Sequence, residues 1–172
     1  MASRFSPSLA KNMIRRSLRA IIDPHPRDEE ITEAWQFFGG LCVYCGKTIT
    51  LGSKDMHLDH LDSETVGGSN HISNRVPACA TCNEKEKREL PWLEFLERKA
   101  PSPAVLEARH QMILAWVGRF PPEAQRLSDE LRLQVGEEIG LAVAAYDLAL
   151  ERLRSRRRPS AELGTAPDRR GM

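Results

Sequence analysis

The four cysteines of this 172-residue chain form two Cys-x-x-Cys pairs, Cys42 with Cys45 and Cys79 with Cys82. Two residues between thiolates let a tight turn point both sulfurs at one ion, and four thiolates complete the closed tetrahedral shell of a structural zinc site. Such a site stabilises a segment that has little apolar core of its own. A redox dithiol is the competing interpretation, but two matched pairs with no spare cysteine favour zinc.

The insert between the two pairs is the second place where the sequence gathers reactive side chains. Its 33 residues exceed the ~15–20 of a simple zinc ribbon, so the insert must hold structure of its own. It contains the stretches Met56-His57-Leu58-Asp59-His60-Leu61, Gly67-Gly68-Ser69-Asn70 and Ser73-Asn74-Arg75-Val76-Pro77, and Asn83 directly follows the last cysteine. We therefore expect the chemistry of this chain, as distinct from its zinc-based stability, to lie here.

Apolar periodicity predicts short extended segments around these side chains and helices before and after them. Strands are expected near 47–51, 56–61 and 75–78, and helices at 11–22, 28–38, 81–90, 91–100, 103–119 and 123–157. Gly39-Gly40 ends the helix at 28–38. Apolar residues recur every three or four positions from Leu127 to Leu153, which indicates packing against the rest of the protein or a second copy.

The order of these motifs resembles the HNH nuclease family of the ββα-metal (His-Me finger) superfamily. The matching elements are Cys-x-x-Cys, Asp59-His60, Gly-Gly-Ser-Asn, Asn74 and Cys-x-x-Cys-Asn83, and they cover about residues 35–98. The resemblance implies an α+β fold: a small ββα-metal core with a four-cysteine zinc knuckle, flanked by an N-terminal helix and a C-terminal pair of long helices. We expect a basic arm at 1–27, a nuclease domain at 28–100, a helical extension at 101–157 and a disordered tail at 158–172.

The same resemblance implies a metal-dependent endonuclease that hydrolyses DNA to 5′-phosphate and 3′-hydroxyl ends. His60 would be the general base, since an imidazole titrates near neutrality. Asp59 and Asn83 would hold Mg²⁺ or Mn²⁺, because such ions take hard oxygen ligands. Asn74 would hold the His60 loop and fix the orientation of the ring. Asp59 and His60 are neighbours on a strand, so their side chains point to opposite faces unless the strand bends.

The sequence departs from the family pattern at two positions that bear on this expectation. The last motif position is Asn83 rather than histidine, a variant that the family contains and that still offers an amide oxygen. A proline is common shortly after the Asp-His pair, and Leu61-Asp62-Ser63 stands there instead. This second difference concerns the conformation of the loop more than the chemistry.

Four further residues are candidates for contacts with substrate phosphates: Arg75, Lys85, Lys87 and His57. Lys85 and Lys87 alternate with Glu84 and Glu86, so a solvated helix face is an equal alternative for these two. His57 has a structural or exposed histidine as its simpler interpretation.

Charge is distributed unevenly, although the net charge of the chain is only +1. Residues 1–27 hold six Lys or Arg and one Asp, residues 151–172 hold seven Arg and three acids, and residues 40–100 are close to balance. Basic ends suit a polyanionic partner, because each neutralised phosphate releases counterions. Solvated, flexible termini explain the charge equally well. The partner expected from the resemblance is DNA, and a homodimer through the C-terminal helices is a further option.

The chain has no apolar run near the ~20 residues that cross a bilayer. Its first residues lack the uninterrupted apolar stretch of a secretion signal, although an arginine-bearing, acid-poor start leaves a transit peptide as an alternative. We expect a cytoplasmic protein without membrane contact. The alternative to an active nuclease is a catalytically inactive, zinc-stabilised nucleic-acid-binding or adaptor module, which would leave Asp59-His60 and Asn83 as coincidence.

Overall fold

A small antiparallel sheet lies in the middle of the chain and carries several of the side chains singled out above. The computed structural model describes residues 6–157 and pairs β1 (Met56–His60) with β2 (Arg75–Cys79). Side chains alternate along a strand, so His57 and Asp59 share one face of the sheet and His60 lies on the other. Helices combined with this small sheet confirm the predicted α+β class.

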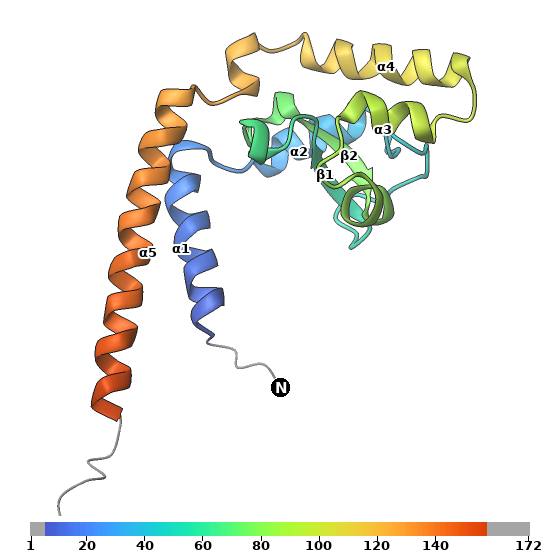
Figure 1. Cartoon of the computed structure of the whole chain (residues 1–172). Helices are drawn as coiled ribbons and strands as arrows, with labels where there is room; N and C mark the ends of the chain where they lie inside the picture. Colours follow the sequence, from blue (N-terminus) through green and yellow to red (C-terminus); the bar gives the residue numbers. More distant parts are fainter. Residues whose placement is uncertain (1–5, 158–172) are drawn as a thin grey trace, which may run out of the picture.

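Helices precede and follow the sheet in the sequence (Figure 1). They are α1 (Pro7–Ile22), α2 (Asp28–Phe37), α3 (Trp92–Lys99), α4 (Pro103–Val117) and α5 (Asp129–Arg157), with the 3-10 helices η1 (Glu64–Val66), η2 (Ile72–Asn74) and η4 (Pro122–Gln125) and the π-helix η3 (Thr81–Lys87). In Figure 1, α2, α3 and α4 gather near the sheet, whereas α1 and α5 run away from it. Within residues 6–157, no helix is both long and apolar enough to span a membrane.

The apolar core near the sheet centres on Trp116 of α4, whose side chain is fully buried. Its ring packs against Phe37 and Phe38 at the end of α2, and aromatic pairs of this kind add ~0.5–1.5 kcal/mol beyond area burial. The indole N–H donates to the carbonyl oxygens of Ile72 and Arg75, at 3.1 and 3.2 Å. These hydrogen bonds attach α4 to the start of β2, where the candidate chemistry lies.

The basic arm expected at 1–27 contains the helix α1 within the residues that the structure describes. α1 begins at a side-chain cap, since Ser6 Oγ accepts a hydrogen bond from Leu9 N–H at 3.2 Å and Pro7 suits a first helical position. α1 and α5 run antiparallel and side by side, and are called the α1–α5 pair below (Figure 1). The expected tail at 158–172 lies outside the described residues.

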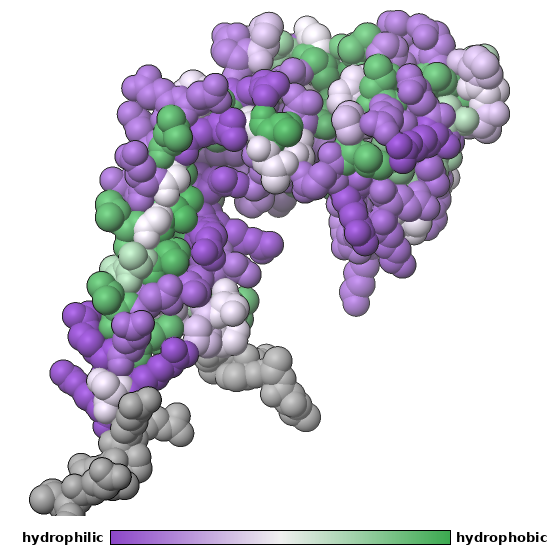
Figure 2. All heavy atoms as spheres, in the orientation of Figure 1, coloured by the Kyte–Doolittle hydropathy of each residue, from purple (hydrophilic) through white to green (hydrophobic). Residues whose placement is uncertain are grey.

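The α1–α5 pair is packed less tightly than the sheet region. No residue of α1 is buried, and none of α5 up to Arg156 is buried either. α5 leaves Leu133, Leu141 and Leu148 exposed. Figure 2 shows hydrophobic residues along the outer side of α5. The apolar stripe predicted along this helix is half-buried from Leu131 to Leu150 and exposed at Leu153, and the three exposed leucines lie outside that stripe.

One predicted strand is wrong because its backbone closes a turn instead. Residues 47–51 form no strand, and the segment makes only an isolated bridge between Leu41 and Thr48. The N–H of Cys42 donates to the carbonyl oxygen of Lys47 at 2.8 Å. This bond folds the chain back around the first cysteine pair, where an extended strand cannot continue.

Two predicted helices differ from the structure in their length or type. The helix expected at 123–157 is split into η4 and α5, because the connecting residues are extended and Leu127 N–H donates to Gly67 O at 3.3 Å. The helix expected at 81–90 is the π-helix η3, which ends at Arg88 with a positive φ of 49°. Single π-helical turns often occur at functional sites.

Candidate functional site

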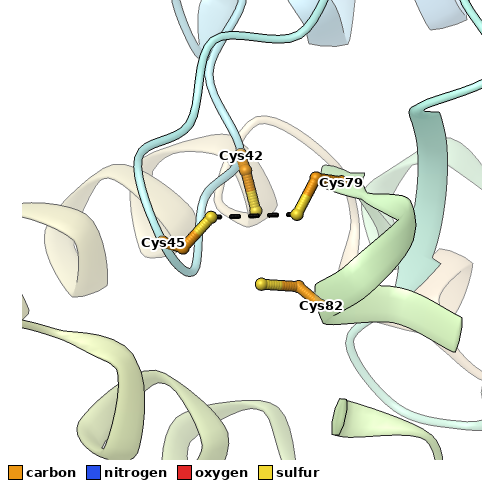
Figure 3. A group of neighbouring side chains, drawn as sticks. All are labelled: Cys42, Cys45, Cys79 and Cys82. Carbon is orange, nitrogen blue, oxygen red and sulfur yellow. Dashed lines mark hydrogen bonds between the residues drawn. The ribbon is translucent and has the colours of Figure 1, made fainter. Parts of the chain in front are cut away.

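Four sulfur atoms converge beside the sheet, as the two Cys-x-x-Cys pairs predict (Figure 3). The ligand atoms of Cys42, Cys45, Cys79 and Cys82 all lie within 4.8 Å of one another, and the Sγ atoms of Cys45 and Cys79 are 3.8 Å apart. Sulfurs bonded at about 2.3 Å to one tetrahedral ion are about 3.8 Å apart, so the cluster fits zinc. The hydrogen bond from Cys82 lowers the pKa of Cys42 to about 5, and the same bond raises the pKa of Cys82, as expected for thiols that share protons in one tight cluster.

Asp59 is held inside the protein by one residue of the knuckle and one residue of η3. Tyr44, between the first two cysteines, donates its hydroxyl to Asp59 Oδ2 at 2.6 Å, and Lys87 Nζ lies 3.0 Å from the same oxygen. The exposed fractions of Asp59 and Lys87 are only 4% and 1%. Burial raises the pKa of Asp59, while Lys87 and Tyr44 act in the opposite direction. The ammonium group of Lys87 thus favours the ionised carboxylate against the effect of burial, and Oδ1 of Asp59 is left without a hydrogen bond.

The sheet face that carries Asp59 meets η3, and this contact brings Asn83 to His57. Asn83 Nδ2 lies 3.1 Å from His57 Nδ1, and His57 Nε2 lies 3.6 Å from a carboxylate oxygen of Glu84. An amide nitrogen only donates, so Nδ1 of His57 accepts and the amide oxygen of Asn83 is left for another partner. Asp59 and Asn83 thus offer two hard oxygens at one sheet–helix interface. This donor chemistry fits Mg²⁺ or Mn²⁺, although Lys87 already balances the charge of Asp59.

His60 points to the opposite face of the sheet, as the alternation of a strand predicts. Its Nε2 lies 3.0 Å from Asn70 Oδ1, and a guanidinium nitrogen of Arg75, its partner in the strand register, contacts both ring nitrogens. Burial and then the charge of Arg75 lower the pKa of His60 to about 4. The ring is therefore neutral near pH 7, and its pKa lies below the near-neutral value that the sequence predicts for this histidine.

Asn70 is itself fixed by Asp23, which follows the last residue of α1. Asp23 Oδ1 accepts from Asn70 N–H at 2.7 Å, and the carbonyl oxygen of Asp23 accepts from Asn70 Nδ2 at 3.0 Å. Both residues are buried. A carbonyl only accepts, so the NH₂ group of Asn70 must face Asp23 and Oδ1 must face His60. It follows that Nε2 of His60 carries the ring proton and Nδ1 is the basic nitrogen.

Asn74 clamps the loop that follows His60. Its Oδ1 accepts from Asp62 N–H, and its Nδ2 donates to the carbonyl oxygens of Asp62 and Ser69, all at 2.9 Å. Contacts of this kind hold the loop, as the sequence predicts. The expectation that Asn74 also orients the ring needs correction, because Asn74 makes no hydrogen bond to the ring and it is Asn70 Oδ1 that accepts from His60 Nε2.

The Gly67-Gly68 turn lets this loop fold tightly against η4. Gly67 has a φ of +94°, and a Cβ on Gly68 would overlap the carbonyl oxygen of Asp62. Neither position tolerates a side chain without strain. Ser69 Oγ then donates to the carbonyl oxygen of Ala124 at 2.6 Å. The C-terminal helices are thereby attached to the loop that carries Asn70.

The four residues expected to contact phosphate differ in how exposed their side chains are. Lys87 is buried and also donates to the carbonyl oxygen of His60 at 2.8 Å, so it matches neither the phosphate-contact interpretation nor the solvated-face alternative. Arg75 is 8% exposed, and its Nε has no partner. Lys85 is exposed. His57 and Arg75 line a hollow of about 510 Å³ between β1 and α2.

The predicted site residues lie near one another in the fold but do not form one cluster. Asp59 and Asn83 reach the same sheet–helix interface, where their side chains have different partners. His60 lies on the opposite face of the sheet, against Asn70 and Arg75. The geometry thus separates a candidate metal-binding side of the sheet from a candidate base on the other side.

Sequence reasoning missed three residues that position this site. Tyr44 lies inside the first cysteine pair and Asn70 inside the Gly-Gly-Ser-Asn motif, so their membership of a motif was an available signal. Asp23 had no such signal, because it meets Asn70 only through the tertiary fold.

Comparison with known proteins agrees with the placement of the motifs. Residues 42–89 match the family model described as HNH endonuclease. The protein named "SPbeta prophage-derived putative HNH endonuclease YoqL" of Bacillus subtilis (strain 168) is 28% identical over 132 residues, which cover 67% of this chain and 54% of that protein. The chain therefore spans about half the length of this curated relative. No solved structure matches the chain. The part of the chain that holds both cysteine pairs, Asp59, His60, Asn74 and Asn83 is thus the part that matches the HNH endonuclease family.

Proposed function

We propose that this chain is a metal-dependent endonuclease that hydrolyses DNA phosphodiester bonds and leaves 5′-phosphate and 3′-hydroxyl ends. The family match of residues 42–89 supports nuclease-type chemistry. The observation that carries the finer proposal is the state of His60, a half-buried imidazole with a lowered pKa whose Nε2 is bonded to an oxygen that only accepts. A neutral ring with one basic nitrogen is what a general base for water requires.

His60 acts in this proposal through Nδ1, which takes a proton from the attacking water. Asn70 keeps the ring in the required tautomer, and Asn74 holds the loop that follows it. Arg75 contacts both ring nitrogens in the structure, so its guanidinium group must turn toward the substrate before Nδ1 meets water. A guanidinium group is well suited to the phosphate that it would then contact.

Asp59 and Asn83 are the residues that would hold a divalent ion, Mg²⁺ or Mn²⁺, through their unengaged oxygens. When bound, the ion supplies positive charge for the scissile phosphate and the departing 3′ oxygen. Tyr44 and Lys87 restrict the orientation of the Asp59 carboxylate through Oδ2. Zinc at the four cysteines has a structural role here, because it fixes the turn that carries Tyr44.

A catalytically inactive, zinc-stabilised nucleic-acid-binding module is the second candidate. It is favoured by the ion pair between Asp59 and Lys87, which satisfies the carboxylate without any bound ion. It leaves unexplained why a half-buried histidine is kept neutral and fixed in one tautomer.

Relaxation of supercoiled plasmid by the full chain separates the two candidates. We expect relaxation with Mg²⁺ or Mn²⁺ and none with EDTA, because hydrolysis needs the divalent ion. The new 5′ ends should accept a kinase label only after phosphatase treatment. DNA binding without relaxation under either ion would favour the inactive module.

A homodimer through the α1–α5 pair is a further part of the proposal. Leu133, Leu141 and Leu148 are exposed on α5. Acidic residues such as Glu130 lie in the first half of the helix and arginines such as Arg154 in the last turns, so two copies packed antiparallel would bring opposite charges together. Light scattering should give twice the mass of one chain, and Leu141→Glu should give a monomer. A monomeric wild type would contradict this part alone.

A further inference from the structure

A basic hollow lies between the α1–α5 pair and the sheet region, outside the segment that matches the HNH family. Its volume is about 680 Å³. The charged and polar residues of its lining include Arg15, Arg16, Arg19, His25, Glu64 and Asn70. Figure 2 shows hydrophilic side chains on the side of the α1–α5 pair that faces the rest of the molecule.

The positive charge of this hollow is not balanced by the protein itself. α1 contains neither aspartate nor glutamate. Arg19 is paired with Glu64, whereas Arg15 contacts the amide oxygen of Asn12 at 3.5 Å. Within residues 6–157, neither Arg15 nor Arg16 forms an ion pair, and both are exposed. Two guanidinium groups are therefore available to an anion at little desolvation cost.

The hollow is continuous with the candidate site through Asn70. Asn70 lines the hollow and hydrogen-bonds Nε2 of His60 at 3.0 Å. Asp23, at the end of α1, holds Asn70 through two hydrogen bonds, and Arg19 reaches Glu64 beside the same loop. The arginine side chains of α1 are thus anchored close to the candidate base.

α5 holds α1 in this position. The two helices pack along their length, and Lys11 forms an ion pair with Asp147 at 3.2 Å. The start of α5 is in turn attached to the glycine loop, where Gly68 and Arg126 form a bridge. Through these contacts, α5 holds the basic helix α1 at the edge of the segment that matches the HNH family.

We infer that this hollow binds the phosphate backbone of duplex DNA beside the scissile bond, with Arg15 and Arg16 each contacting a phosphate. The inference rests on the proposed function. A nuclease substrate extends beyond the phosphate that is cut, and the flanking phosphates require cations that the nearly neutral segment 40–100 does not provide. Guanidinium groups match phosphate in both charge and hydrogen-bond geometry.

The test measures binding of the full chain to a fluorescently labelled duplex DNA in EDTA, so that no cleavage occurs. Arg15→Ala/Arg16→Ala should bind about tenfold more weakly at about 0.15 M salt and should lower the slope of log Kd against log salt by about 2, one for each phosphate that is no longer neutralised. Circular dichroism and zinc content should match the wild type, since both side chains are exposed.

Lys54→Ala/Arg98→Ala removes the same charge from exposed positions outside the hollow and is the matched control. Its loss of affinity should be clearly smaller. Equal losses in the two variants, or wild-type affinity in Arg15→Ala/Arg16→Ala, would overturn the inference. Tighter binding of the wild type to duplex RNA than to duplex DNA would overturn the choice of substrate. Weaker DNA binding by Arg15→Ala/Arg16→Ala, together with a wild type that never relaxes plasmid, would contradict the proposed function and leave this DNA-binding surface standing.

Discussion

The sheet region and the α1–α5 pair are stabilised by different kinds of interaction. The sheet region buries polar groups and matches them locally, as Asp59 with Lys87 and Tyr44 illustrates. The α1–α5 pair has no buried residue up to Arg156 and exposes leucines such as Leu141. Burying apolar area contributes roughly 25 cal/mol per Å², so a half-buried pair gains little from it. The first region is specified by its own contacts and by a cysteine cluster that fits zinc, whereas the second leaves apolar side chains exposed.

The largest expected effect comes from removing a zinc ligand. Cys82→Ser should abolish zinc binding and the cooperative unfolding transition of the sheet region, because the binding free energy of a structural zinc, about 10–16 kcal/mol, is folding free energy. Val135→Ala in the half-buried α1–α5 pair should cost less than about 2 kcal/mol. Thermal unfolding measures the loss of stability in each variant, and metal analysis measures the zinc content of Cys82→Ser. A Cys82→Ser protein with the wild-type transition would show that the sheet region does not depend on the cysteine cluster for its stability.

The next effect concerns the buried ion pair of the sheet region. Lys87→Met leaves the Asp59 carboxylate buried without its cation, which should lower the free energy of unfolding by about 3–5 kcal/mol in urea denaturation. Adding Asp59→Asn should recover part of this loss, because the amide carries no charge. Lys85→Met is the matched control on the exposed side of η3 and should change stability by less than about 0.5 kcal/mol. Equal effects of the two lysine variants would refute the structural role of Lys87.

A smaller effect tests the link between the two regions. Asp23→Ala removes the acceptor of the Asn70 N–H and should slow plasmid nicking about tenfold, because Asn70 is then held only through the main-chain carbonyl of residue 23 and its Oδ1 restrains the His60 ring less firmly. Asp23→Asn keeps an acceptor oxygen and should retain most of the rate. Nitrogen NMR shifts of the imidazole should show a proton on Nε2 in the wild type and a mixture in Asp23→Ala. A wild-type tautomer in Asp23→Ala would show that Asp23 does not position the ring.

The sequence was most informative where a residue type determines local geometry. Cys-x-x-Cys spacing predicted the cysteine cluster, and strand alternation predicted that Asp59 and His60 point to opposite faces. The alternation of Lys85 and Lys87 with glutamates does not predict the burial of Lys87, because η3 is a π-helix, whose wider turn changes which residues share a face. The contact between Asp23 and Asn70 depends on how α1 and the loop pack together, which no local pattern encodes.

Plasmid nicking by His60→Ala is the most direct measurement of the central claim. The variant should keep the zinc content and unfolding transition of the wild type and should nick at least about 100-fold more slowly with Mg²⁺ or Mn²⁺, because a positioned general base contributes ~10²–10⁴ to the rate. His110→Ala on α4 is the matched control and should nick at the wild-type rate. A folded His60→Ala protein with wild-type activity would contradict the assignment of His60 as the base.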